Sequence, residues 1–98
     1  SEGRKEASRR ARARAAWHRP ARMKRLLGIE PDKLFQLGRE YAALELDKQA
    51  VQLFRAALPA ALREEEKARE IVSYLAMLGD WPGAARAARE LLAVYPGS

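Results

Sequence analysis

The chain has 98 residues, enough for one small domain, and carries 19 Lys and Arg against 13 Asp and Glu, a net charge of +6. It has no Cys and a single His, which excludes a disulfide framework, thiol catalysis and metal sites built from His and Cys. Its 48% hydrophobic content is too high for a wholly disordered chain, and no apolar run reaches the roughly 18 residues of a membrane span.

The positive charge is concentrated near the N-terminus. Residues 1–30 hold ten basic and three acidic side chains, a net charge of +7. Residues 31–98 hold nine basic and ten acidic side chains, a net charge of −1. The chain therefore divides into a strongly basic N-terminal segment and a near-neutral body.

Residues 1–19, called here the basic arm, are expected to be disordered, or helical only when bound, because their arginines point all round and leave no apolar face. Guanidinium groups pair with phosphates and an indole stacks on an unpaired base, which favours nucleic acid or ribonucleoprotein. An acidic protein, an anionic lipid surface, a targeting role and a plain solvated tail are the alternatives. The residues predicted to contact the anionic partner are Arg4, Lys5, Arg9, Arg10, Arg12, Arg14, Trp17, Arg19, Arg22, Lys24 and Arg25.

Residues 20–30 are predicted to form a short capping helix and a linker. Pro20 and Gly28 bracket residues 21–27, whose apolar side chains recur at helical spacing. We expect that apolar edge to lie on the first helix of the body. Its members are Met23, Leu26 and Leu27.

The body, residues 31–98, is predicted to be helical throughout, since it is rich in Ala, Leu, Glu, Arg, Lys and Gln and poor in Val and Ile. Pro31 suits a first helical position, and Ile29 with Leu34 has the spacing of a hydrophobic staple. Short loops require neighbouring helices to be antiparallel. The first expected helix runs from Pro31 to about Leu46, and the second runs from a cap at Asp47 to about Leu58, where Pro59 ends or kinks it. A third helix follows to about Leu78, and a fourth begins at Pro82 and stops at Pro96.

The body also contains an internal repeat. Ala50 and Ala84 lie 34 residues apart, and so do the predicted interhelix turns. Two helices in each 34-residue unit define the units 31–64 and 65–98. Gly38 and Ala50 are small where the helices of the first unit must approach closely, so Gly38→Leu or Ala50→Leu is expected to overpack it.

Particular residues recur at this period. The first unit contains Leu34, Leu37, Gly38, Tyr41, Ala50, Phe54 and Ala57, and the second contains Gly79, Asp80, Trp81, Ala84 and Pro96. The pattern resembles the tetratricopeptide repeat, although the second unit departs from it at Val72, Leu75, Ala88 and Leu91. The resemblance implies an all-α fold of antiparallel helix pairs stacked as a short superhelix.

By the same resemblance, the first helix of each unit lines a concave groove for a protein or peptide partner. Small side chains leave room there, two apolar side chains offer contact, and two arginines suit carboxylates. The predicted groove residues are Phe35, Arg39, Ala42, Ala43, Arg69, Ser73, Ala76 and Met77. A clamp for C-terminal carboxylates, which uses Lys and Asn, is set aside because the chain lacks Asn.

The last helix is expected to expose an apolar end face, because two repeats without a capping helix leave one side uncovered. A second copy of the chain, a larger assembly or a further C-terminal part would cover it. The predicted end-face residues are Leu91, Leu92, Val94 and Tyr95.

No arrangement typical of catalysis, metal binding or cofactor binding is apparent, so we predict a non-enzymatic adaptor without cofactors. Its repeats would hold a protein or peptide, and its arm would dock on an anionic partner. The alternative is a structural subunit of a larger complex or a homo-oligomer. A membrane partner is disfavoured. The Arg- and Ala-rich composition without Asn or Thr favours a bacterium that has a GC-rich genome or is thermophilic. The expected location is the cytoplasm, with an organelle as the alternative.

Overall fold

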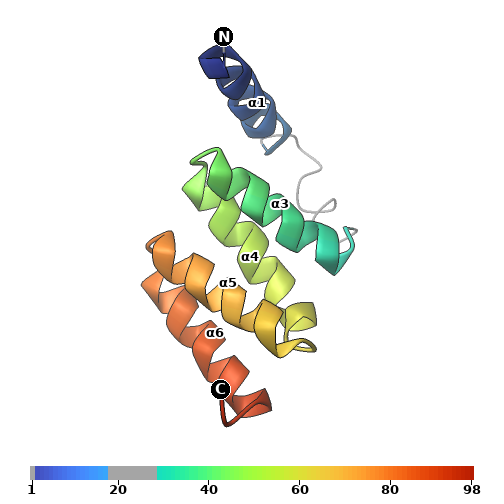
Figure 1. Cartoon of the computed structure of the whole chain (residues 1–98), viewed down its shortest axis with the longest axis vertical. Coiled ribbons are helices and arrows are strands. Elements are labelled where there is room, and N and C mark those ends of the chain that lie inside the picture. The colour runs from blue at the N-terminus through green and yellow to red at the C-terminus, as the bar shows by residue number, and fades with distance from the viewer. Residues whose placement is uncertain (1, 18–28) are drawn as a thin grey trace.

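The computed structural model describes residues 2–17 and 29–98, and over these residues the fold is all-α, as the sequence predicts (Figure 1). The helices succeed one another down the long axis of the molecule, from α1 at the N-terminal end to α6 at the C-terminal end (Figure 1). Their bounds are α1 Glu2–Trp17, α3 Pro31–Ala43, α4 Asp47–Ala61, α5 Glu65–Met77 and α6 Trp81–Val94.

The body consists of two helical hairpins, α3–α4 and α5–α6, that stack through contacts between α4 and α5. Their helix boundaries repeat closely at 34 residues: α3 and α5 begin at Pro31 and Glu65, and α4 and α6 begin at Asp47 and Trp81. The 34-residue period read from the sequence is therefore also the period of the helices. It relates each position of the first hairpin to one position of the second.

Several helix limits differ from the sequence prediction, the clearest of them in the first hairpin. The first hairpin turns at Ala43 rather than Leu46, and Asp47 is the first residue of α4, not its cap. Pro59 lies inside α4, which continues to Ala61. Because Pro59 is in the last turn, its missing N–H removes one hydrogen bond near an end that frays readily, and the helix tolerates it.

The core lies between the hairpins and is centred on Phe54, which is completely buried. The ring of Phe54 stacks on Tyr74 of α5, with ring centroids 4.5 Å apart, and meets Phe35 of α3 edge-on at 5.8 Å. A Cβ atom on Gly38 would lie 2.9 Å from the Phe54 ring, so glycine is what allows α3 to approach α4. Leu34, Leu53 and Phe54 are buried in this core, and Leu37 and Tyr41 pack against it.

Polar contacts also fix one hairpin against the other. Arg55 of α4 donates two hydrogen bonds, of 2.7 and 2.5 Å, to the carboxylate of Asp80, the N-cap of α6. Lys67 of α5 donates to Asp32 of α3 at 2.8 Å. The hydroxyl of Tyr95 donates to the carbonyl of Leu62 at 2.9 Å. The hydrogen bond from Arg55 lowers the pKa of Asp80, and the hydrogen bonds to Asp32 and Glu64 raise that of Lys67.

Residues 2–17 of the basic arm form the helix α1. Ala and Arg are strong helix formers, and this local preference is sufficient to favour a helix without an apolar face. The hydroxyl of Tyr41 in α3 donates to the carbonyl of Ala13 in α1 at 3.0 Å. Burial, followed by the charge of Glu40, raises the pKa of Tyr41.

In the part of the chain that the structure describes, no helix combines the length and the apolar character needed to cross a membrane.

Candidate functional site

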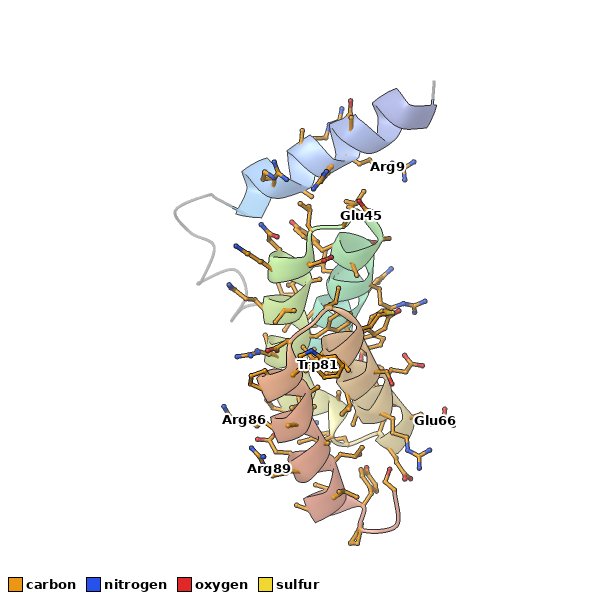
Figure 2. All side chains as sticks on the ribbon, turned by 90° about the vertical axis from the view of Figure 1, so that its left-hand side faces the viewer. Arg9, Glu45, Glu66, Trp81, Arg86 and Arg89 are labelled. Atoms are coloured by element: carbon orange, nitrogen blue, oxygen red, sulfur yellow. The ribbon has the colours of Figure 1, made fainter. Side chains whose placement is uncertain are left out.

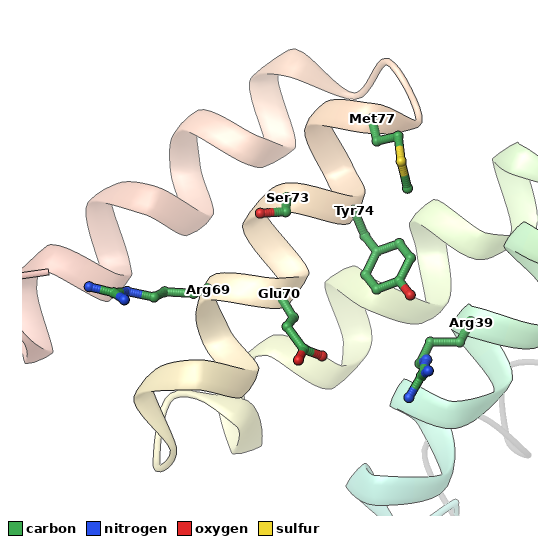
Figure 3. A pocket seen from close by; sticks show the side chains of 6 residues that line it. All are labelled: Arg39, Arg69, Glu70, Ser73, Tyr74 and Met77. Atoms are coloured by element: carbon green, nitrogen blue, oxygen red, sulfur yellow. The ribbon is translucent and has the colours of Figure 1, made fainter.

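A hollow of about 400 Å³ opens between α3 and α5, the first helices of the two hairpins. Figure 3 shows the Tyr74 ring between the Met77 side chain on one side and Arg39 on the other. The residues that line it are Arg39, Arg69, Glu70, Ser73, Tyr74 and Met77. Four of the eight predicted groove residues therefore surround one hollow: Arg39, Arg69, Ser73 and Met77.

Buried aromatic packing beneath the hollow holds Tyr74 in position. Its ring stacks on Phe54, and the edge of Phe35 meets it with ring centroids 6.4 Å apart. Phe35 is itself buried, so the prediction that it lines the groove is wrong. A large aromatic side chain at that position gains more by filling the space between the hairpins than by facing solvent.

The two predicted arginines have different surroundings. Arg69 donates from Nε to the Ser98 hydroxyl at 2.8 Å and lies 3.6 Å from Glu65, so these two contacts compete with a ligand for its guanidinium. Arg39 is exposed and forms no ion pair with any described residue. Arg39 is therefore the cation most available to a ligand carboxylate in this hollow.

The predicted alanines do not line the hollow. Ala42 and Ala76 are half-buried and pack against the hydrophobic core. Ala43 is exposed, but it borders a second space of about 470 Å³ between α1 and the end of α3.

Two lining residues, Glu70 and Tyr74, were not predicted. Both lie on α5 at helical spacing from Ser73 and Met77, so the face they share could have been found from periodicity. Tyr74 packs against the core and also lines the hollow, so its apolar ring alone indicates only a core position.

The described arginines of the arm are all exposed: Arg9, Arg10, Arg12 and Arg14. None of them forms an ion pair with a described residue. Arg4, Lys5 and Trp17 belong to the same helix, but the description does not extend to their side chains. Arg19, Arg22, Lys24 and Arg25, together with the predicted capping helix with Met23, Leu26 and Leu27, lie outside the described residues.

The predicted end face is only partly exposed. Leu92 and Val94 are exposed, by 45% and 51%. Leu91 is buried against the hairpin core, and Tyr95 is half-buried with its hydroxyl bonded to Leu62. Leu91 faces α5 because it lies on the same side of α6 as Ala84 and Ala87, which are also buried.

No family model, curated protein or solved structure matches this chain. The resemblance to the tetratricopeptide repeat thus stays a prediction from its residues.

Proposed function

We propose that the protein is a non-enzymatic interaction module whose hollow between α3 and α5 binds a short segment of a protein partner. The observation that supports this most is the juxtaposition of Arg39, free of ion pairs with described residues, with Tyr74 and the 72% exposed Met77. An exposed Met is a flexible apolar surface suited to varied side chains. The tetratricopeptide-like superhelix belongs to the same proposal.

The chemistry of the hollow defines the segment. Met77 and the Tyr74 ring offer contact to one apolar side chain, and Arg39 offers a fork of donors to a carboxylate. Glu70 disfavours a second carboxylate on its side of the hollow, and the hydroxyl of Ser73 can hydrogen-bond to a peptide backbone. The expected ligand is a peptide with one acidic residue close to one bulky apolar residue.

A peptide library displayed on phage and selected against the full chain tests this proposal. Selected peptides should share an Asp or Glu beside a Leu, Ile, Met or Phe. In fluorescence polarisation, Arg39→Ala should weaken the binding of these peptides about tenfold or more, since a charge-assisted hydrogen bond contributes roughly 1.5–3 kcal/mol. Arg86→Ala, on α6 outside the hollow, is the matched control and should leave the affinity unchanged.

Selected peptides that bind equally well to the native chain, to Arg39→Ala and to Met77→Ser would refute the hollow as the site. Circular dichroism of each variant should show unchanged helicity, because both side chains are exposed.

The exposed arginines of α1 support a second contact, with nucleic acid. A fluorescein-labelled single-stranded RNA of 20 nucleotides should bind the full chain with an affinity that falls linearly with salt on logarithmic scales, with a slope of about −0.7 for each phosphate neutralised. Deleting residues 1–19 should abolish this binding and leave the body helical. Binding that survives the deletion would contradict the role of the arm.

A further inference from the structure

We propose that the outer face of α6 is a docking site for a helical hairpin of a partner protein. This face, called here the α6 stripe, combines two exposed bulky side chains, Trp81 (68%) and Leu92 (45%), with two alanines between them. Trp81, Ala85, Ala88 and Leu92 follow one another at steps of four, three and four residues, so they form a single line along the helix. Figure 2 shows Trp81 at the start of α6, with Arg86 and Arg89 projecting from its side.

The 34-residue register of the two hairpins shows which neighbour this stripe lacks. The positions equivalent to Ala88 and Leu92 in α4 are Phe54 and Leu58, and both are buried. In α4 the Phe54–Leu58 part of this line faces α5, where Phe54 stacks on Tyr74, and its first residue, the exposed Asp47, borders the turn between α5 and α6. Among the described residues nothing covers the equivalent line of α6, so it repeats a surface that elsewhere in the molecule receives a helix.

Two charged residues repeat the polar ties between the hairpins in the same way. Arg55 hydrogen-bonds to Asp80, and the residue equivalent to Arg55 in α6 is Arg89. Asp32 accepts a hydrogen bond from Lys67, and the residue equivalent to Asp32 in α5 is Glu66. Arg89 and Glu66 are exposed, and neither forms an ion pair with a described residue. They lie on different helices of the last hairpin (Figure 2).

These positions define the chemistry of the occupant. The first helix of the partner hairpin should carry a Lys or Arg near its start, for Glu66, and its turn should carry an Asp or Glu, for Arg89. It should also place a bulky apolar side chain opposite Ala88, because alanine leaves there the volume that Phe54 fills in α4.

A second copy of this chain fits less well. Its α3–α4 hairpin would have to dock through α3, but the Tyr41 hydroxyl on that helix already contacts α1. The residue equivalent to Tyr74 in α3 is Glu40, an acidic side chain that would oppose the apolar Ala88. A partner with its own hairpin of the α5–α6 type meets all three requirements.

The probe for the experiment is a second copy of residues 65–98, joined directly after Ser98 of the full chain. In this copy Lys67 should lie opposite Glu66, and Asp80 should lie opposite Arg89. Trp17→Phe, and Trp81→Phe in the added copy, leave Trp81 of the natural chain as the only indole. We expect Trp81 fluorescence to shift to shorter wavelength and the thermal unfolding midpoint to rise relative to the chain without the copy.

Leu92→Ser should remove both effects in the extended chain while leaving the midpoint of the natural chain nearly unchanged, which separates docking from folding. Arg89→Glu should reduce the effects, and Asp80→Arg in the added copy should restore them. Arg86→Glu breaks only the ion pair with Glu90 within α6 and should leave the Trp81 shift unchanged. Unshifted Trp81 emission, or a shift that persists in Leu92→Ser, would overturn the proposal. So would a homodimer of the natural chain that Leu92→Ser abolishes in analytical ultracentrifugation.

Discussion

The two hairpins share one register but bury their second helices differently. The first hairpin places Phe54 against Gly38 within the hairpin and against Tyr74 across the interface, and it leaves Phe54 fully buried. The second hairpin has Val72 and Ala88 at the positions of Gly38 and Phe54, and both are half-buried. The same backbone arrangement therefore supports a tightly packed centre in one hairpin and an open outer face in the other.

The largest expected effect is on the packed centre. Phe54→Ala should lower the free energy of unfolding by about 3–5 kcal/mol, because it removes a fully buried ring that packs against both α3 and α5. Urea denaturation followed by circular dichroism measures the change. Leu92→Ala is the matched control on α6 and should cost much less, since its side chain is 45% exposed. Equal losses for the two variants would contradict the difference between the hairpins.

The next effect concerns the close approach of α3 to α4. Gly38→Leu and Gly38→Val should each cost about 1–3 kcal/mol, because any Cβ at this position would meet the Phe54 ring. Combining Gly38→Val with Phe54→Ala reproduces the residue pair of the second hairpin and should cost less than the two single changes added together. A double-mutant cycle measures this coupling. If the two losses in free energy were strictly additive, the larger side chain at position 38 would not fill the space left at position 54.

The third effect concerns the tie between the hairpins. Asp80→Ala removes the N-cap of α6 and the two hydrogen bonds from Arg55. It should lower the free energy of unfolding by about 0.5–2 kcal/mol at neutral pH. The folded state lowers the pKa of Asp80, so its stabilisation is complete above the ordinary value of 3.8 and is lost as the pH falls through the folded value.

Thermal unfolding of the native chain and of Asp80→Asn between pH 2 and pH 7 measures this contribution. The two midpoints should differ most at pH 7 and converge at low pH. A difference that grew toward low pH would have the wrong sign and would contradict the assignment.

The smallest effect lies in the two turns. Glu45 and Gly79 occupy equivalent positions and both have positive φ, 59° and 86°. Only glycine adopts this conformation without a steric cost, so Glu45→Gly should stabilise the chain slightly and Gly79→Ala should destabilise it by about 1 kcal/mol. Differential scanning calorimetry of both variants provides the comparison, and shifts of the same sign would contradict it.

Much of the fold can be predicted from the sequence because its information is local and periodic. Proline, glycine and the 34-residue spacing define the hairpins, and the large apolar residues at helical intervals define the core. The side that Phe35 faces could not be predicted in this way. It lies on the border between core and groove, and only the position of Tyr74 on the next hairpin places it inside.

The candidate site was predicted in part for the same reason. Arg39, Ser73 and Met77 lie at positions that the resemblance to the tetratricopeptide repeat implies for a groove, and all three line the hollow. Arg69 hydrogen-bonds to Ser98, which lies 29 residues away along the chain, so no local pattern reveals this contact. Likewise, Leu91 and Leu92 are neighbours in sequence, and only the rotation of α6 against α5 decides which one is buried.

The helix of the arm shows a different limit. Apolar patterning correctly indicates that residues 7–14 lack a face for the core, and their arginines are exposed. Patterning says less about backbone conformation, which in this segment follows the intrinsic preference of Ala and Arg for helix.

The hollow between α3 and α5 is proposed to receive a segment of a partner protein. The most direct test is a heteronuclear NMR titration of the full chain with a selected phage peptide, following backbone amide shifts. Saturable shifts should centre on Arg39, Ser73 and Met77 and leave Trp81 and α1 unaffected. Shifts centred on α6 or on residues 2–17, with the hollow unchanged, would contradict it.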